Sequence, residues 1–385
     1  MLTVALLTSN EMAAEAIAQM LEESGIFKLV YRSSVQSGTY TTVRALGALD
    51  PEVLLLDLGE WDEIATLVPQ LKRAGARVLP IGFREEWTKN QQVEFEAAGI
   101  VDLIREPFSV PDLERAVYDG LHRERPIHNP NILAFLPAKA GGGCSTVVLH
   151  TAAALVQEFG KKVLLMEGDR RSGVLSMMLN LDSPRGLSGA LSEASELTEL
   201  AWRNYHESVS GLDILLADPA RRGPLPTWGQ YYQLLQFVQN QYEYVLADLP
   251  EVVNQATAEV VKSARGVFLV CTPELPSIKM AAHRCQELEE CEIPQNRIHV
   301  ILNRFERDGL SVADVEGALE RPIFAALPND YVRTRDAMLA SRLVASDTPF
   351  GKACNSLAEK LSGLPSGPQK QGRFSLLQKL GRIID

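Results

Sequence analysis

The stretch of sequence that decides the fold is residues 139–146, which read KAGGGCST. It lies between a short apolar run at 132–136 and a helical pattern that starts at Thr146. Glycines let the backbone curl so that successive N–H groups point inward, and the N-terminus of the helix adds partial positive charge. A glycine-rich turn between a strand and a helix would account for the glycines alone. We favour a phosphate-binding loop, because strand, glycines, Ser145-Thr146 pair and helix occur in the order that such a loop requires.

Short apolar runs alternate with longer helical patterns on both sides of this stretch. The runs lie at residues 4–7, 53–56, 77–82, 101–104, 132–136, 163–166, 214–217, 244–247, 267–271 and 298–302. Such alternation is typical of parallel sheets covered by helices. We therefore expect two α/β domains, at residues 1–122 and 131–361, joined by a linker at 123–130 that contains two prolines. Residues 362–385 form a Gly/Pro/Ser-rich spacer and a basic amphipathic tail.

The composition is that of a folded protein from a reducing compartment. Of 385 residues, 46% are hydrophobic and 23% are charged, and the formal net charge of −11 disfavours broad non-specific binding to DNA. The five cysteines are scattered and form no CxxC pair, so we expect neither a disulfide framework nor a structural zinc site. The N-terminus lacks the basic start of a signal peptide, and no apolar run reaches about 18 residues. We expect a cytoplasmic protein.

Two aspartates that follow apolar runs are candidate partners of the glycine stretch. Asp169 stands two residues after Glu167 at the end of one run, and Asp248 ends another. Ligands of open α/β sheets bind at the carboxyl ends of strands, and the Ser145 hydroxyl stands where it could contact Mg²⁺. Each aspartate alone could be a cap at a strand end. Together, Ser145, Asp169 and Asp248 predict a magnesium–nucleotide site.

The glycine stretch resembles the deviant Walker A motif, KGGxGK(S/T)T, of the MinD/ParA family of ATPases. Lys139 matches the signature lysine, which in this family reaches across a dimer to the partner's nucleotide. The stretch departs from the motif at Ala140, which replaces a glycine, and at Cys144, which replaces the lysine of the phosphate-binding loop. The resemblance implies a MinD/ParA-like P-loop NTPase domain with ATP and Mg²⁺ as cofactors.

Other positions match functional residues of the same family. Asp169 matches the aspartate that helps to arrange the attacking water, and Asp248 matches the Walker B aspartate. Asn303-Arg304 resembles the adenine-recognising pair, and Pro328-Asn329-Asp330 resembles a late segment near the base. The resemblance therefore implies catalytic roles for Lys139, Asp169 and Asp248, metal contacts from Ser145 and Asp248, and nucleotide contacts from Gly141, Gly142, Gly143, Cys144, Ser145, Thr146, Asn303, Arg304 and Pro328.

The replacement of the loop lysine by Cys144 predicts slow or absent hydrolysis. That lysine neutralises charge on the transferring phosphate, and loss of one such group typically costs about 10²–10³ in rate. Backbone amides and Mg²⁺ do not depend on it, so nucleotide binding should survive better than turnover. Lys139 could supply a cation in trans, within a dimer. Two interpretations of Cys144 stay open: a thiol under redox control, or a small residue that the loop tolerates.

The first domain resembles a two-component receiver domain, which has a flavodoxin-like parallel sheet. Asp57 stands at the position of the phosphorylated aspartate. A working receiver also needs an acidic pair, a Ser/Thr and a Lys, but here residues 8–11 offer at most one carboxylate, Gly82-Phe83 replaces the Ser/Thr, and Glu106 reverses the charge of the Lys. Phosphorylation of Asp57 and a strand-end aspartate without chemistry are the two interpretations. The substitutions favour the second, and with it an atypical receiver used for docking or dimerisation.

A receiver-like domain followed by a MinD-like domain resembles the CpaE/TadZ family of pilus-assembly proteins. The phrases GLDILLA at 211–217, TPELPS at 272–277 and LPND at 327–330 also look like that family. The resemblance implies an ATP-binding homodimer that localises the Tad/Flp pilus secretion machine at a cell pole, with the secretion components as partners. Two alternatives are an active MinD/ParA-type ATPase that positions cargo and a scaffold in which both domains are catalytically dead.

Residues 370–385 predict a short amphipathic helix. Phe374, Leu377, Leu380 and Ile384 share one face, and basic side chains flank it. The segment resembles the C-terminal membrane-targeting helix of MinD, which implies peripheral contact with anionic lipids. Docking of the helix on a protein surface is an alternative of equal weight.

Overall fold

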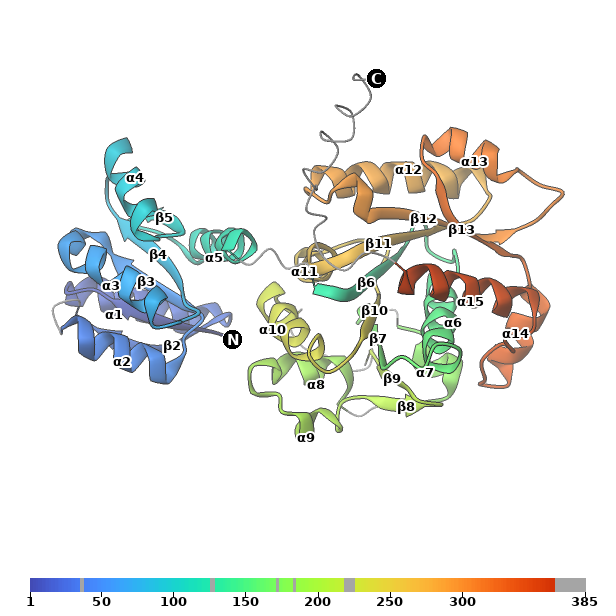
Figure 1. Cartoon of the computed structure of the whole chain (residues 1–385), viewed down its shortest axis with the longest axis horizontal. Helices are drawn as coiled ribbons and strands as arrows, with labels where there is room; N and C mark the ends of the chain where they lie inside the picture. Colours follow the sequence, from blue (N-terminus) through green and yellow to red (C-terminus); the bar gives the residue numbers. More distant parts are fainter. Residues whose placement is uncertain (35–37, 125–128, 171–172, 183–184, 218–225, 364–385) are drawn as a thin grey trace, which may run out of the picture. The chain divides into compact units, whose positions relative to one another are not determined.

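The computed structural model describes residues 1–34, 38–124, 129–170, 173–182, 185–217 and 226–363. The chain divides into two units, Met1–Ile127 and His128–Asp385. In each unit a largely parallel sheet is covered by helices (Figure 1). The predicted succession of a smaller and a larger parallel α/β domain is confirmed.

The sheet of the first unit has the strand order β2-β1-β3-β4-β5, with parallel pairing throughout its described part. Its strands are β1 (Leu2–Leu7), β2 (Phe27–Ser33), β3 (Val53–Asp57), β4 (Leu79–Arg84) and β5 (Asp102–Arg105). Its helices are α1 (Glu11–Ser24), α2 (Thr39–Leu49), α3 (Trp61–Arg73), α4 (Lys89–Ala98) and α5 (Val110–Glu124). This strand order is that of flavodoxin-like folds, as the sequence predicted.

Burial explains which strands of the first unit the sequence could predict. In the central strand β3, the four residues before Asp57 are fully buried, because helices cover both faces of the sheet. A strand in that position is a continuous apolar run. The edge strand β2 buries only Phe27 and leaves its other side chains partly or fully exposed, so it carries no apolar run and was missed.

The second unit contains the larger sheet, whose described strands follow the order β13-β12-β11-β6-β10-β7-β9-β8. They are β6 (Asn129–Pro137), β7 (Val163–Glu167), β8 (Glu207–Val209), β9 (Leu212–Leu215), β10 (Tyr244–Asp248), β11 (Ala264–Cys271), β12 (Ile298–Phe305) and β13 (Ile323–Pro328). The edge strand β8 pairs antiparallel with β9, and the other described pairs are parallel. Strand β6, which leads into the glycine stretch, therefore lies at the centre of the sheet.

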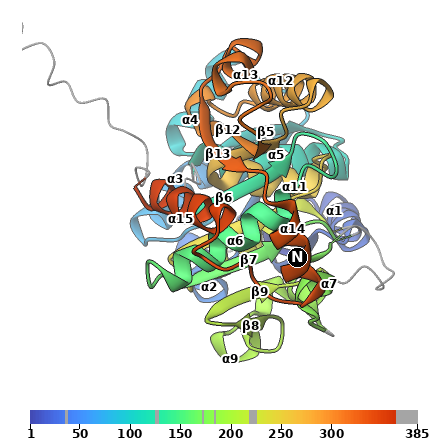
Figure 2. The same ribbon diagram turned by 90° about the vertical axis from the view of Figure 1, so that its right-hand side faces the viewer.

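Two layers of helices bury this sheet. They are α6 (Cys144–Gln157), α7 (Leu175–Leu179), α8 (Gly186–Ser192), α9 (Glu199–Trp202), α10 (Trp228–Val238), α11 (Gln255–Ser263), α12 (Leu275–Glu290), α13 (Val312–Leu319), α14 (Tyr331–Leu339) and α15 (Pro349–Ser362). Helices α6 and α15 lie side by side on one face, where Leu155 and Leu357 share a core cluster (Figure 2). Helices α10, α11 and α12 contribute Leu235, Val260 and Ala281 to the core on the other face.

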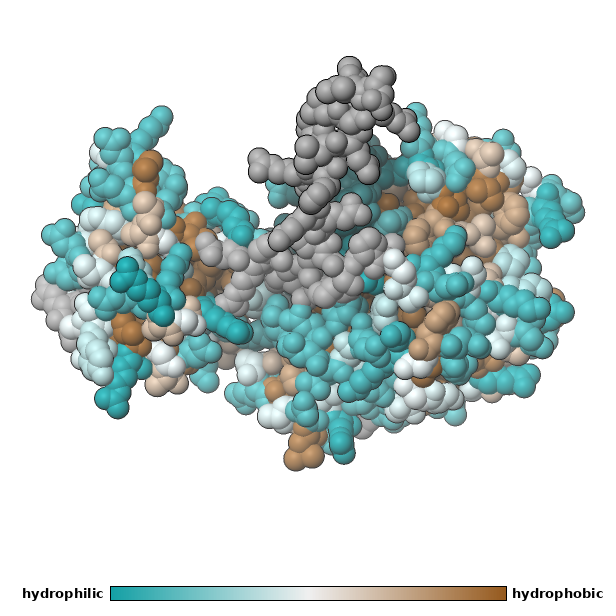
Figure 3. Space-filling model, viewed as in Figure 1, coloured by the Kyte–Doolittle hydropathy of each residue, from teal (hydrophilic) through white to brown (hydrophobic). Residues whose placement is uncertain are grey.

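The edge strand β13 is only partly covered. Ile323 and Phe324 are half-buried and Ala326 is exposed, and apolar surface is visible over this region of the unit in Figure 3. Two charged side chains form hydrogen bonds with backbone groups of the strand. Lys360 Nζ donates to Phe324 O at 2.9 Å, and Ile323 N–H donates to Glu316 at 2.8 Å. Such contacts disfavour the addition of a further strand at an exposed edge.

Parts of the predicted organisation lie outside the described residues. Helix α5 runs to Glu124 and β6 begins at Asn129, so the structure does not describe residues 125–128 of the predicted linker. The amphipathic tail at 370–385 is likewise outside the described residues. None of the helices in the described ranges is both long enough and apolar enough to cross a membrane.

Candidate functional site

The glycine stretch forms a curled loop between β6 and α6. Gly141 and Gly143 adopt left-handed φ angles of 81° and 84°. A side chain at Gly143 would also collide with Asn303, whose Nδ2 would lie 2.6 Å from a Cβ at this position. Because both backbone conformation and space exclude a side chain, glycine is required at position 143.

Helix α6 begins at Cys144, two residues before the start that the sequence pattern suggested. Gly143 is the N-cap residue and offers no side chain to the amides of the first turn. The first helical bond runs from Val147 N–H to Gly143 O. The amides of Cys144, Ser145 and Thr146 therefore have no acceptor within the helix, the arrangement that binds anions at helix N-termini.

The side chains of Asn303 and Arg304 donate hydrogen bonds to backbone carbonyls of the loop. Asn303 Nδ2 donates to Gly142 O at 2.9 Å, and Arg304 Nη2 donates to Gly141 O at 3.1 Å. Arg304 also has a left-handed φ of 56°, an uncommon conformation for a residue with a side chain. The pair that the sequence assigned to the base thus also fixes the carbonyls of the phosphate-binding loop.

Asp248, at the end of β10, meets the start of α6. The Ser145 hydroxyl and the Cys144 thiol lie close enough to its carboxylate to influence its pKa. Burial raises the pKa of Asp248 to about 7, and the nearby charges of Glu167 and Asp169 act in the same direction. The structure therefore brings together Ser145, Asp169 and Asp248, which the sequence predicted as one site.

The side chain of Cys144 is buried against this carboxylate. Burial raises the pKa of the Cys144 thiol well above its usual range, and the Asp248 charge raises it further. A redox-sensitive cysteine needs a stabilised thiolate and access to solvent. Burial and the raised pKa disfavour the interpretation of Cys144 as a redox-controlled thiol and favour that of a small residue that the loop tolerates.

Glu167 is a buried site residue to which sequence reasoning gave no role. Its two carboxylate oxygens accept from Leu175 N–H and Ala217 N–H, each at 2.8 Å. A Cβ at Gly173 would lie 2.5 Å from Glu167 Cδ, so the chain after β7 passes directly over the carboxylate. Burial raises the pKa of Glu167. Its position beside Asp169 was visible in the sequence, but the amides that it binds lie up to 50 residues away.

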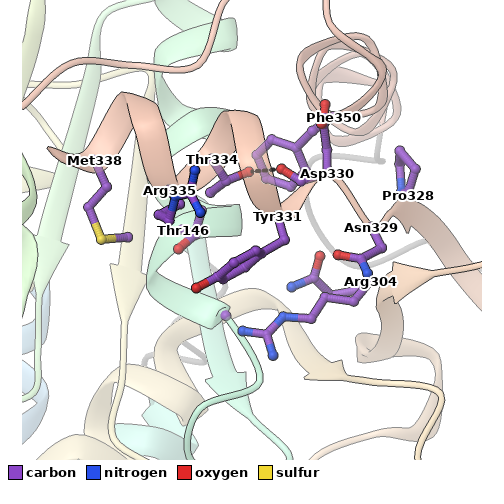
Figure 4. A pocket seen from close by; sticks show the side chains of 12 residues that line it. Thr146, Arg304, Pro328, Asn329, Asp330, Tyr331, Thr334, Arg335, Met338 and Phe350 are labelled. Carbon is purple, nitrogen blue, oxygen red and sulfur yellow. Dashed lines mark hydrogen bonds between the residues drawn. The ribbon is translucent and has the colours of Figure 1, made fainter. Parts of the chain in front are cut away.

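A cavity of about 180 Å³ adjoins the loop at Gly143 and Thr146. Its lining includes the residues that the sequence placed near the base: Asn303, Arg304, Pro328, Asn329 and Asp330. Figure 4 shows Arg304 and Tyr331 extending from different elements toward the start of α6. The predicted phosphate-binding and base-binding groups are thus contiguous.

Asp330 and α14 complete this cavity. Asp330 Oδ1 pairs with Arg333 at 2.9 Å, whereas Oδ2 is buried without a hydrogen-bond partner. A water molecule or a ligand that donates a hydrogen bond could satisfy a buried carboxylate oxygen of this kind. The sequence missed the lining residues of α14, among them Tyr331 and Thr334, because no motif marks them beyond their place after Asp330.

Lys139 stands apart from the other predicted groups. It is exposed, and its side chain forms no hydrogen bond or ion pair with another residue in the part of the chain that the structure describes. A contact with a nucleotide in trans would need this exposure.

The donor set fits Mg²⁺ in combination with a nucleotide. The described residues contain no group of three or more His, Cys, Asp or Glu side chains able to hold a metal ion by themselves. Mg²⁺ is usually bound by one or two carboxylates together with phosphate and water oxygens. Ser145 and Asp248 could hold it in this way, since both reach the same point beside the loop.

The strand-end aspartate of the first unit has a different environment. Thr8 Oγ1 donates to Asp57 Oδ2 at 2.7 Å, and Gly59 N–H donates to Oδ1 at 2.9 Å, so Asp57 caps the short 3₁₀ helix that follows β3. Burial raises the pKa of Glu106, and the Asp57 charge contributes to the increase. These contacts support the interpretation of Asp57 as a strand-end cap.

The fold and the loop together define the second unit as an α/β domain with the P-loop NTPase fold of MinD/ParA proteins. A ParA family ATPase from Chlorobium tepidum superposes with a TM-score of 0.55 at 22% identity, covering 60% of this chain and 99% of that protein. MinD from Pyrococcus horikoshii, complexed with Mg-ADP, superposes with a TM-score of 0.51 at 20% identity, covering 60% and 96%.

Sequence comparison points to the same proteins. An uncharacterized ATP-binding protein of Methanocaldococcus jannaschii is 25% identical over 256 residues, which is 64% of this chain and 94% of that protein. The septum site-determining protein MinD of Thermotoga maritima is 23% identical over 250 residues, 60% of this chain and 88% of MinD. No family model matches the chain. The chain is thus homologous to MinD/ParA-family ATPases over its C-terminal part, about 60% of its length.

Proposed function

We propose that this protein is an ATP-binding, dimerising localisation factor with slow or absent hydrolysis. The observation that carries the proposal is the position of Asp248 beside Cys144 and Ser145 at the start of α6, where no side chain caps the first amides of the helix. The loop retains the groups that bind phosphate and Mg²⁺. It lacks the lysine that would neutralise charge during phosphoryl transfer.

Three parts of the site would bind the phosphates, Mg²⁺ and the base respectively. The amides of Cys144, Ser145 and Thr146 would hold the phosphates, with partial positive charge from the N-terminus of α6. Ser145 and Asp248 would hold Mg²⁺, which supplies charge neutralisation when bound. The cavity at Asn303, Arg304 and Pro328 would take the base, and Asp330 Oδ2 offers an acceptor suited to the amino group of adenine.

Exposed apolar side chains beside the site support dimerisation. Met177, Val252 and Leu275 are exposed, and each follows the carboxyl end of a strand: β7, β10 and β11 respectively. Lys139 is exposed at the same edge of the sheet. Apolar side chains at a functional edge are a common feature of interfaces. A second copy bound there would receive Lys139 as the cation that its own loop lacks.

The experiment that tests this proposal is a mass measurement with ATP, with ADP and without nucleotide. We expect ATP-dependent doubling of the mass, together with little release of phosphate. Failure to bind ATP would contradict the proposal and favour a catalytically dead scaffold. Turnover at the rate of a family member with an intact loop lysine would instead favour the alternative of an active MinD/ParA-type ATPase.

The role in a Tad/Flp pilus secretion machine is supported by the sequence resemblance of the two-domain arrangement to CpaE/TadZ proteins. With this role, the protein would act in the cytoplasm, at the inner face of the membrane or at a cell pole, and the secretion components would be its partners. A fluorescent fusion expressed together with those components should form polar foci. Uniform distribution in the presence of the assembled machine would contradict this role.

A further inference from the structure

A carboxylate from the chain itself reaches the phosphate-binding loop. Glu251 follows Asp248 by three residues, in the segment between β10 and α11. Its Oε2 accepts a hydrogen bond from Ala140 N–H at 2.7 Å. Ala140 lies between Lys139 and Gly141, in the glycine stretch that leads to the first amides of α6. An acidic side chain therefore contacts the loop.

Arg284 of α12 forms a long ion pair with the other oxygen of this carboxylate. Arg284 Nη2 lies 3.8 Å from Glu251 Oε1, and Arg284 Nη1 lies 2.5 Å from Glu287 Oε2. The Arg284 side chain is only 18% exposed, and it pairs with both Glu287 and Glu251. Glu251 is thus held between a loop amide and a well-positioned guanidinium, rather than extending freely into solvent.

The direction of a bound nucleotide follows from the position of the cavity. Gly143 and Thr146 line the cavity that would take the base, at one end of the glycine stretch. Ala140 lies toward the other end of that stretch. The phosphate farthest from the base would therefore approach Ala140 and Glu251, whereas the phosphates nearer the base would lie over the first amides of α6.

We propose that Glu251 determines how the loop discriminates between nucleoside diphosphates and triphosphates. This inference rests on the proposed function, because it assigns a regulatory residue to the same site. While Glu251 accepts from Ala140, its charge repels a third phosphate, and binding of a triphosphate requires the carboxylate to leave the loop. The segment that follows β10 then moves with the carboxylate. Binding of the third phosphate therefore changes the position of Val252.

The test is the ratio of the dissociation constants of ATP and ADP, measured with Mg²⁺ on the full-length protein. Glu251→Gln removes the charge and keeps the shape of the side chain. We expect the variant to bind ATP about tenfold more tightly relative to ADP than the unmodified protein does, because like charges near a phosphate disfavour its binding. Hydrogen exchange of the Ala140 amide without nucleotide gives a second measurement, and Glu251→Ala should accelerate it.

Glu243→Gln is a matched control. Glu243 Oε2 also accepts from a backbone amide, Lys162 N–H at 2.9 Å, and its Oε1 pairs with Lys161 at 3.0 Å. Glu243 directly precedes β10 and Lys162 directly precedes β7, so this contact lies at the amino ends of the strands, whereas the loop lies at their carboxyl ends. The control variant should leave the ratio unchanged. An unchanged ratio in Glu251→Gln, with both nucleotides bound, would overturn this inference alone. Absence of nucleotide binding in every variant would overturn the proposed function and the inference with it.

Discussion

The strand-end aspartates of the two units, Asp57 and Asp248, occupy equivalent places in two parallel sheets. Each lies at the carboxyl end of a strand beside a hydroxyl group, that of Thr8 for Asp57 and that of Ser145 for Asp248. Asp57 satisfies its second oxygen with Gly59 N–H of its own strand end. Asp248 instead meets a glycine loop and is buried among other acids. Topology therefore supplies the position, whereas the neighbouring loop decides whether that position can bind a nucleotide.

The largest expected effect concerns the thiol that contacts Asp248. Cys144→Lys restores the cation that P-loop enzymes use and should raise ATP hydrolysis by about 10²–10³ if the other groups are in place. Cys144→Ala, which keeps a small neutral side chain, should leave the slow rate unchanged. The rate of phosphate release from the two variants checks this. Equal rates in the lysine and alanine variants would show that a missing cation is not what limits turnover.

Removal of the charge at Asp248 or at Asp57 tests which of the two aspartates contributes to nucleotide binding. Asp248→Asn should weaken Mg²⁺-dependent ATP binding by about 10–100-fold, because the metal loses a charged ligand. Asp57→Asn, the equivalent change in the first unit, should leave ATP binding unchanged. Calorimetric titration of both variants measures the difference. Similar losses of affinity would indicate that the two aspartates act on one site.

The raised pKa of Asp248 predicts pH-dependent nucleotide binding. Its carboxyl group must lose a proton to bind Mg²⁺, and its pKa lies at about 7, so affinity should rise about tenfold between pH 6 and pH 8. The stability of the nucleotide-free protein should change in the opposite sense. Because the folded pKa exceeds the unfolded value of 3.8, the contribution of this group is complete below pH about 4 and is lost as the pH rises through 7. Asp248→Asn should remove both dependences.

The smallest effect is expected in the first unit. Asp57→Ala removes the cap of the 3₁₀ helix after β3, which should lower the free energy of unfolding of this unit by about 1 kcal/mol. Chemical denaturation followed through Trp61, which begins α3, measures this loss. Treatment with a small phosphodonor should not modify Asp57. Stable phosphorylation there would restore the receiver interpretation and remove the contrast with Asp248.

Strands buried on both faces were predictable from the sequence, and exposed ones were not. The central strands β3, β6 and β10 are continuous apolar runs because helices cover both of their faces. The edge strand β2 mixes apolar with charged residues, so no continuous run marks it. The edge strand β13 does contain an apolar run, IFAAL at 323–327, but it was not among the predicted strands. Helix α6 starts earlier than expected because Gly143, which carries no capping side chain, is its N-cap.

The candidate site was predictable only where its residues belong to short motifs. Local spacing placed Ser145 beside the glycines, and the resemblance placed Asn303 and Asp330 near them. The contact between Ala140 and Glu251 joins residues 111 positions apart, and no pattern in either local sequence predicts it. The same holds for the bond between Glu167 and Ala217. Long-range polar contacts of this kind depend on packing that no local pattern records.

The central claim is that a glycine loop without its lysine still binds a nucleoside triphosphate. Equilibrium dialysis of the full-length protein with labelled ATP and Mg²⁺ tests it most directly, with Asp248→Asn as the comparison. We predict one ATP bound per chain, without matching release of phosphate, and much weaker binding by the variant. No ATP retained by the unmodified protein, or equal retention by the two proteins, would contradict the account.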